Sequence, residues 1–385
     1  MNLSKILNEL GEKRHEYLNA VSPPIFQTSN FSFDSVNKLR KSLKKEFENH
    51  FYTRGLNPTV EILRKKMAAL EKCEDSIIFS SGCAAITAAI LSQIKSNDHI
   101  ICVQKPYSWT NFLLSEYLKK FNIKTTFING KNPNNFKKAI KKNTKIIYLE
   151  SPNSISFEIQ DLNKISEIAK QNNIITICDN SYCSPLYQNP KLHGIDIIIH
   201  SASKYISGHS DVVAGVLCAN KKIIDNIFSK EFMTFGGIIS PHDAWLILRG
   251  LRTLKLRVDQ SNKSANDIIK VLENHPKIEK IIYPMHSKNK QIELAKKQMK
   301  KAGGLFSIIL KTQNINKIEK FCNSLNHFLI ACSWGGHESL IFPICALYES
   351  QNYKHKMPIN LIRIYIGLED SNLLMRDIEQ ALKKI

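Results

Sequence analysis

Short apolar segments alternate with helical patterns between residues 76 and 218, and this alternation restricts the possible folds more than any other feature. The apolar segments predict strands at residues 77–80, 99–103, 124–128, 145–150, 174–179, 196–200 and 212–218. Helical patterns separate several of them, at residues 109–120, 134–141 and 162–171. Strands that alternate with helices predict an α/β fold, with a mainly parallel sheet covered by helices on both faces.

Several predicted strands are followed by residues suited to binding. These residues are Gly82, Tyr107, Asn153, Asp179 and Lys204. Ligands of open parallel sheets bind beyond the carboxyl ends of the strands, so the five positions predict one shared site. At the first of them, Ser80-Ser81-Gly82 joins a strand to a helix, where free N–H groups and the positive helix end favour an anion.

Lys204 lies on a predicted turn between two strands, next to the small hydroxyl residues Ser201 and Ser203. A buried lysine loses its proton more easily than a solvated one, because burial disfavours the ammonium form. The neutral amine can then form a Schiff base with a carbonyl compound. The alternative is an ordinary solvated lysine, which is the more common case when the position is taken alone.

The composition restricts the cellular setting and the partners. The 385 residues include nine cysteines and no CxxC pair, which indicates buried thiols in a reducing compartment, and no metal site. We therefore expect a cytoplasmic protein. No apolar run reaches the length of a membrane span, so we expect no membrane partner. The net charge of +20 makes a nucleic-acid-binding protein the alternative, but the lysines spread along the chain without a basic tail, so we expect no nucleic-acid partner.

Residues 1–55 predict an N-terminal region of helices and an extended arm. A helical pattern covers residues 1–20, an extended arm 21–33 and a charged helix 38–50. Tyr52 and Arg54 alternate in the turn that follows, so both side chains are expected to point the same way. The planar guanidinium of Arg54 suits a phosphate.

We expect two further domains, one over residues 56–250 that contains the predicted sheet and one over residues 251–385. The last begins with a long helical stretch at residues 251–274. Strands are predicted near residues 278–283, 305–310 and 361–366, and helices near residues 314–325 and 372–384. This mixture predicts a smaller α+β domain.

Eight short motifs, spread over nearly the whole chain, together resemble one enzyme family. They are YTRGLNPT at Tyr52, SSGCAAI at Ser80, ESPNS at Glu150, CDNSY at Cys178, SASKYISGHSD at Ser201, RGLRTL at Arg249, SWGGHESL at Ser333 and LIRIYIGLED at Leu361. The family is the cysteine and methionine metabolism group of pyridoxal-phosphate (PLP) enzymes, the trans-sulfuration enzymes, with the aspartate-aminotransferase-like fold (fold type I). Within it, FDSV at Phe33, ESPNSISFE at Glu150 and SWGG at Ser333 look most like bacterial cystathionine β-lyase.

The resemblance implies PLP as the cofactor and a role for each matching residue. Lys204 would hold the cofactor covalently, and Asp179 would keep its pyridine nitrogen protonated. Tyr107 would stack on the ring. The phosphate would be bound by Gly82, Cys83, Ser201 and Ser203. Tyr52 and Arg54 would reach the cofactor of a neighbouring subunit, which implies a homo-oligomer, usually a tetramer built as a dimer of dimers.

The substrate would be a small amino acid held through its α-carboxylate by Arg363, with help from Asn153 and Ser333. The family commonly has Asn-Pro after ESP, and Asn153-Ser154 replaces it here. Trp334 either shapes the distal substrate pocket or only packs. Arg363, Asn153, Ser333 and Trp334 are thus the expected substrate-binding residues.

The implied reaction is β-elimination of L-cystathionine to homocysteine, pyruvate and ammonia, with Lys204 as nucleophile, base and acid in turn. Cystathionine γ-synthase, γ-lyase and homocysteine-forming sulfhydrylase are the alternatives. Many γ-acting relatives carry a glutamate before the serine of Ser-x-Gly-Gly, where this chain has Cys332, and Trp334 follows that serine; both favour β-chemistry. Reprotonation on the opposite face, with Tyr107 or Tyr52 as a second catalytic group, would give a secondary amino-acid racemase activity.

Overall fold

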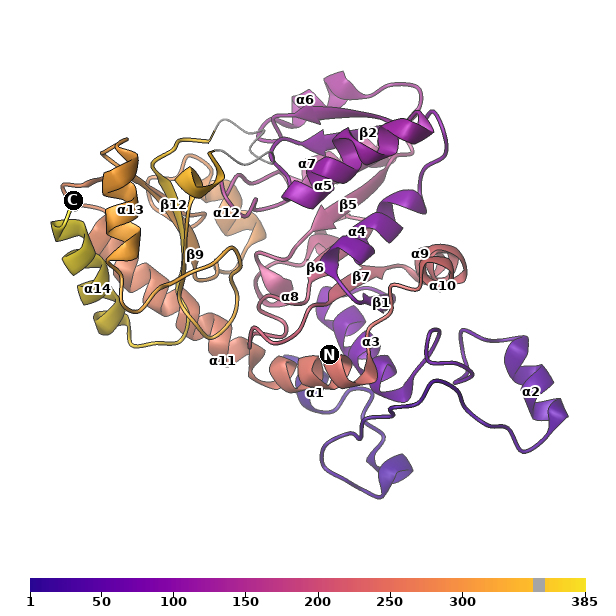
Figure 1. Cartoon of the computed structure of the whole chain (residues 1–385). Helices are drawn as coiled ribbons and strands as arrows, with labels where there is room; N and C mark the ends of the chain where they lie inside the picture. Colours follow the sequence, from indigo (N-terminus) through magenta and orange to yellow (C-terminus); the bar gives the residue numbers. More distant parts are fainter. Residues whose placement is uncertain (349–356) are drawn as a thin grey trace.

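The computed structural model describes residues 1–348 and 357–385 of the chain. Within these residues, two β-sheets are connected by a long helix (Figure 1). The larger sheet contains β1 (Asp75–Phe79), β2 (His99–Val103), β3 (Lys124–Ile128), β4 (Thr144–Glu150), β5 (Ile175–Asp179), β6 (Ile197–Ser201) and β7 (Gly215–Ala219). Their order across the sheet is β1-β7-β6-β5-β4-β2-β3.

Apolar side chains fill both faces of the larger sheet, because its central strands are apolar at nearly every position. One face packs against α3 (Pro58–Glu71), α7 (Leu162–Gln171) and α8 (Ser184–Tyr187). The opposite face packs against α4 (Gly82–Leu91), α5 (Ser108–Ser115) and α9 (Lys221–Ile227). The predicted α/β fold with a mainly parallel sheet is confirmed. Strand β7 is the exception, because it runs antiparallel to both β1 and β6.

The carboxyl ends of β1, β2, β4, β5 and β6 lie at one edge of this sheet, since these strands run parallel to one another. The predicted binding residues lie at or just after these ends: Gly82, Tyr107, Asn153, Asp179 and Lys204. Gly82 starts α4, whose Ser81 hydroxyl caps the helix by accepting from Ala84 N at 3.1 Å.

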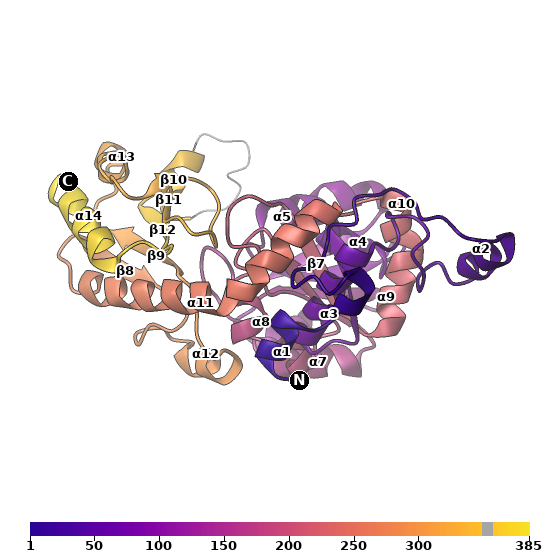
Figure 2. The same cartoon turned by 90° about the horizontal axis from the view of Figure 1, so that it is seen from below.

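The smaller sheet follows helix α11 (Pro241–Leu272), which runs between the two sheets (Figures 1 and 2). It contains β8 (Ile278–Ile282), β9 (Leu305–Leu310), β10 (Leu329–Ile330), β11 (Leu340–Pro343) and β12 (Leu361–Tyr365). Helices α12 (Ile292–Gln298), α13 (Ile315–Asn323) and α14 (Ser371–Lys383) belong to the same region. The helix expected to begin at residue 251 begins at Pro241, because the Ser240 hydroxyl caps it. The domain boundary at residue 250 falls within α11 and stays a prediction.

Short helical segments lie around both sheets, with η5 beside the smaller one. They are α6 (Pro133–Ala139), α10 (Met233–Phe235), η2 (Tyr117–Phe121), η3 (Pro190–His193), η4 (Phe228–Phe232) and η5 (Ile344–Leu347). Among the described residues, every helix is too short or too polar to span a bilayer.

The N-terminal region contains less helix than its sequence pattern predicts. Helix α1 (Leu3–Asn8) is followed by η1 (Arg14–Tyr17), so the helix predicted over residues 1–20 is interrupted. Gly11 has φ +82°, a conformation that does not continue a helix. Helix α2 (Val36–Leu43) ends before the predicted residue 50. Helix α2 lies in a segment that extends away from the rest of the chain (Figures 1 and 2).

Candidate active site

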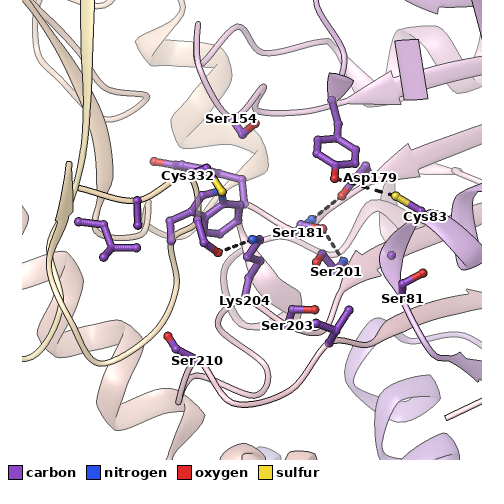
Figure 3. Close-up of a pocket in the computed structure, with 18 of the residues that line it drawn as sticks. Ser81, Cys83, Ser154, Asp179, Ser181, Ser201, Ser203, Lys204, Ser210 and Cys332 are labelled. Atoms are coloured by element: carbon purple, nitrogen blue, oxygen red, sulfur yellow. Dashed lines mark hydrogen bonds between the residues drawn. The ribbon is translucent and has the colours of Figure 1, made fainter. Parts of the chain in front are cut away.

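A cavity of about 440 Å³ lies at the carboxyl edge of the larger sheet and is closed from the other side by residues of the C-terminal region. The predicted site residues that line it are Gly82, Cys83, Tyr107, Asp179, Ser201, Ser203, Lys204, Ser333, Trp334 and Arg363. Figure 3 shows Lys204, Asp179, Ser201 and Ser203 near one another, with Cys332 approaching from the C-terminal region. Positions far apart in the chain therefore meet at one site.

Lys204 lies on a tight turn after β6 that the surrounding chain fixes in place. Gly208 N donates to Lys204 O at 2.8 Å. The buried Arg257 guanidinium on α11 donates to Tyr205 O at 2.9 Å, and it lies so close to Gly208 (φ +72°) that a side chain there would overlap it. The backbone of this turn is therefore held by a buried cation from the long helix.

The Lys204 amine points toward the C-terminal region, where its Nζ donates to Ser333 Oγ at 2.6 Å (Figure 3). Burial lowers the pKa of this amine, and the positive charge of Arg363 lowers it further. Gly335 (φ +94°) allows the approach, since a Cβ there would lie 2.9 Å from Lys204 Cα. The amine thus has a larger neutral fraction than a solvated lysine.

Asp179 ends β5 with a buried carboxylate that faces the cavity. Ser181 N donates to Asp179 Oδ1 at 2.9 Å. Burial raises the pKa of this carboxyl, whereas the Ser181 hydrogen bonds and the positive charges of His200 and Lys204 act in the opposite direction. A cationic ligand group opposite this carboxylate would stabilise its ionised form.

Small residues and N–H groups line the cavity near the start of α4. The first turn of a helix leaves N–H groups without intrahelical partners, so Gly82 and Cys83 present amides there. A Cβ on Gly82 would lie 3.3 Å from Ser201 Cα, so the glycine allows the helix start to approach β6 closely. Ser203 Oγ, which accepts from Ala214 N at 2.9 Å, adds a hydroxyl.

Tyr107 precedes α5 and lines the cavity with its ring half exposed. The Cys83 thiol donates to its hydroxyl at 3.9 Å (Figure 3). Burial raises the pKa of the Tyr107 hydroxyl, so this group is protonated at neutral pH.

Arg363 lies on β12 and brings a buried cation to the opposite wall. Burial lowers the pKa of its guanidinium to about 10, which leaves it charged at neutral pH. Its Nη2 donates to Cys332 O, and the guanidinium lies 5.3 Å from the centre of the Phe342 ring.

Trp334 is buried, and the centre of its ring lies 5.4 Å from that of the Tyr205 ring. It also lines the cavity, so it both packs in the core and shapes the pocket.

Three predicted site residues do not line the cavity. The Asn153 amide donates to Lys105 O at 2.5 Å and to Glu150 Oε1 at 3.1 Å, so the loop after β4 uses both of its N–H groups. Tyr52 and Arg54 lie on the N-terminal arm, where the guanidinium is 5.4 Å from the tyrosine ring. A single copy of the chain therefore does not bring these residues to the site.

The lining residues that the sequence did not predict include Glu150, Ser154, Ser181 and Glu338. Glu150 is buried and accepts from Tyr107 N at 2.7 Å and from Ser154 N at 3.1 Å. Burial and the nearby charge of Asp179 raise its pKa to about 7, against the effect of these N–H groups. Its place in the ESPNS motif was the available signal.

The residues of the cavity fit PLP. The amides of Gly82 and Cys83 suit its phosphate, the buried Asp179 carboxylate suits a protonated ring nitrogen, and Lys204 offers an amine of lowered pKa to its aldehyde. The described residues contain no group of three or more His, Cys, Asp or Glu side chains placed to hold a metal ion.

Comparison with known proteins agrees with this fit. The model of the family described as "Cys/Met metabolism PLP-dependent enzyme" matches residues 5–383. The chain belongs to this family. It is therefore a PLP-dependent lyase of Cys/Met metabolism, as its motifs predicted.

Relatives in this family carry names for more than one reaction. The chain is 36% identical to the L-methionine gamma-lyase of Fusobacterium nucleatum subsp. nucleatum, over 94% of this chain and 93% of that protein. It is also 36% identical to the cystathionine beta-lyase of Lactococcus lactis subsp. cremoris, over 95% of this chain and 94% of that protein.

A solved structure of the putative O-acetylhomoserine (thiol)-lyase of Campylobacter jejuni subsp. jejuni is similar over the whole of both chains. Its TM-score is 0.93, with 28% sequence identity. That structure contains N'-pyridoxyl-lysine-5'-monophosphate, which agrees with PLP as the family cofactor.

Proposed function

We propose that this lyase cleaves the carbon–sulfur bond of L-cystathionine by β-elimination, giving homocysteine, pyruvate and ammonia. The observation that carries the proposal is that Lys204 is the one amine among the described lining residues, and that burial lowers its pKa toward that of a base. β-Elimination needs a single base that removes the Cα proton, whereas γ-elimination also has to move a proton at Cβ.

The carboxylates among the described cavity residues each accept at least one hydrogen bond, and the proposal gives none of them the Cα proton. Glu150 accepts from two backbone N–H groups. Glu338 Oε1 accepts from Ser210 Oγ at 2.5 Å, and its Oε2 lies 3.2 Å from His337 Nδ1. Asp179 accepts from Ser181 N and faces the cofactor nitrogen in this proposal.

Arg363, Lys204 and Ser333 have separate roles in the proposed β-elimination. When bound, PLP supplies an electron sink for the charge that develops at the substrate Cα. Arg363 binds the α-carboxylate with two parallel N–H donors and so orients the Cα–H bond. Lys204 Nζ removes the Cα proton and returns it to the departing sulfur, while Ser333 Oγ, 2.6 Å away, positions the amine.

The keto acid released tests this proposal. We expect purified protein with PLP to produce pyruvate from L-cystathionine as the main keto acid, because one base acts at Cα. Chromatography of the derivatised products measures pyruvate and 2-oxobutyrate separately. Predominance of 2-oxobutyrate would contradict β-elimination and identify the alternative below.

The alternative is γ-elimination, and one observation favours it. The relative named methionine gamma-lyase is as similar to this chain as the relative named cystathionine beta-lyase. Keto acid release from L-methionine, measured beside L-cystathionine, distinguishes the two.

A second activity, slow racemisation of amino acids, is favoured by the protonated Tyr107 hydroxyl, which lies in the same cavity as Lys204. Chiral analysis of L-alanine after incubation with the protein tests this activity.

We also propose that the active enzyme is a homo-oligomer. The phosphate end of the cavity has amides and hydroxyls from one copy, and Lys204 and Arg363 are its only lysine and arginine among the described lining residues. Arg54 lies on the N-terminal arm, outside its own cavity. An arm from a second copy would bring this guanidinium, and Tyr52, to the phosphate.

Arg54→Ala tests this contact. We expect PLP to dissociate about 10- to 100-fold more readily, since a hydrogen bond to a charged group contributes about 1.5–3 kcal/mol. Absorbance titration of the apoprotein with PLP measures the change, and sedimentation velocity gives the oligomeric state. Arg40→Ala, an exposed arginine on α2, is the matched control. Unchanged PLP affinity in Arg54→Ala would exclude the proposed contact.

A further inference from the structure

A buried polar cluster lies on the face of the larger sheet opposite the cavity. Its charged members are Glu71, at the end of α3, and His200, on β6, and neither side chain is exposed. Successive residues of a strand point to opposite faces, so His200 points away from the cavity that its neighbour Ser201 lines. The proposed mechanism uses neither Glu71 nor His200.

Close hydrogen bonds connect the members of this cluster. His200 Nε2 lies 2.5 Å from Glu71 Oε1, and Asn180 Nδ2 donates to the same oxygen at 2.8 Å. Asn189 Nδ2 donates to Glu71 Oε2 at 3.5 Å. Asn180 also donates to Gln188 O at 2.9 Å. The carboxylate thus holds side chains from two adjacent strand ends.

A carboxylate removed from water in this way is costly unless a cation pairs with it. Among the described residues, His200 is the one ion-pair partner of Glu71, and Asn180 and Asn189 are the amide donors to the same carboxylate. Among those residues His200 Nδ1 has no hydrogen-bond partner, so the imidazole contacts the cluster through Nε2 alone.

The pair is connected to Asp179 through the backbone and one hydroxyl. Asn180, which Glu71 holds, directly follows Asp179, and its N–H donates to Ile199 O at 2.8 Å. Ser201, which directly follows His200, donates its N–H to Ser181 Oγ at 2.7 Å. Ser181 N in turn donates to Asp179 Oδ1 at 2.9 Å. The charge of His200 also lowers the pKa of the Asp179 carboxyl, against the effect of burial.

We propose that Glu71 and His200 are positioning residues that act through Asp179: from the far face of the sheet they fix its carboxylate opposite the PLP ring nitrogen. This inference rests on the role proposed above for Asp179. Neither residue touches the cofactor or the substrate.

The double variant Glu71→Gln/His200→Gln tests the inference. It removes the carboxylate and the imidazole together, so no unpaired carboxylate is left in the core, and an amide at position 200 can still donate to position 71. We expect PLP to bind about tenfold more weakly to this variant, the size of effect typical when a supporting residue behind a ligand is lost. Absorbance titration of the apoprotein gives the dissociation constant, and the melting temperature of the apoprotein reports folding.

The same substitutions in an Asp179→Asn background separate positioning from a general structural role. If the pair acts through Asp179, PLP binds equally to Asp179→Asn and to the triple variant, because the carboxylate on which the pair acts is gone. His99→Gln is the matched control. His99 is an equally buried histidine, held by Thr144 and Thr126 at the other end of the sheet. We expect this control to leave PLP affinity unchanged.

The outcomes distinguish the inference from the proposal on which it rests. Weaker PLP binding by the double variant, without further loss in the triple variant, supports the inference. An equal loss in both backgrounds, or no loss in either while Asp179→Asn weakens binding, overturns it and leaves the role of Asp179 intact. Unchanged PLP affinity in Asp179→Asn overturns the role of Asp179 and the inference with it.

Discussion

Lys204→Ala is expected to lower kcat/KM for carbon–sulfur cleavage by about ten-thousand-fold, the upper range for loss of a positioned acid–base group. The variant loses both the amine that attaches PLP and the base that removes the Cα proton. Keto acid release measures the loss. Borohydride treatment followed by peptide mass analysis is expected to place pyridoxyl on Lys204 in the parent protein and nowhere in the variant.

Two controls separate this loss from misfolding. Lys221→Ala removes an exposed lysine that pairs with Asp225 on α9, and we expect it to retain parental activity. The melting temperature of Lys204→Ala should stay close to that of the parent, because the turn is held through backbone contacts of Arg257 and Gly208. Activity above one hundredth of the parent in Lys204→Ala would contradict the proposed roles.

The sequence predicted the larger sheet and its binding edge well, because both depend on local patterns. A strand such as β5 reads as an apolar run that ends in a polar residue, and Asp179 then has to lie at the edge. Gly82 follows Ser80-Ser81 at a strand–helix junction, which fixes a helix start beside the sheet. These features need only a few neighbouring residues to be recognised.

Local sequence patterns did not predict the side of the cavity that the C-terminal region forms. Ser333 and Arg363 reach Lys204 only because α11 and the antiparallel pair β11–β12 fold back toward the larger sheet. Their assignment relied on family motifs instead. Glu71 and His200 are 129 positions apart, so nothing in the pattern near either residue indicates their contact.

Local patterns show neither how a polar side chain is used in the fold nor where a helix is interrupted. Asn153 carries the right chemistry for a carboxylate, but its amide closes the loop after β4, and Ser154 lines the cavity instead. The predicted first helix is amphipathic over residues 1–20, yet Gly11 turns the chain after α1. Periodicity cannot distinguish a continuous helix from two short segments that bury the same side chains.

Arg363→Lys is expected to lower kcat/KM for L-cystathionine by about 10- to 100-fold. A lysine keeps the charge but lacks the planar fork, so it cannot make two parallel hydrogen bonds to a carboxylate. A hydrogen bond to a charged group contributes about 1.5–3 kcal/mol, and the loss of one of the two corresponds to this range. Burial lowers the pKa of Arg363 only to about 10, so the parent guanidinium is charged throughout the neutral range.

A pair of competitive inhibitors isolates this contact from any general damage to the cavity. Glycine carries an amine and the carboxylate that Arg363 is proposed to hold, whereas methylamine carries the amine alone. We expect Arg363→Lys to raise the inhibition constant of glycine strongly and that of methylamine hardly at all, since only the first ligand loses a partner. Equal weakening of both inhibitors would mean that the substitution disturbs the cavity as a whole, for example through the lost bond to Cys332 O, and that another residue binds the carboxylate.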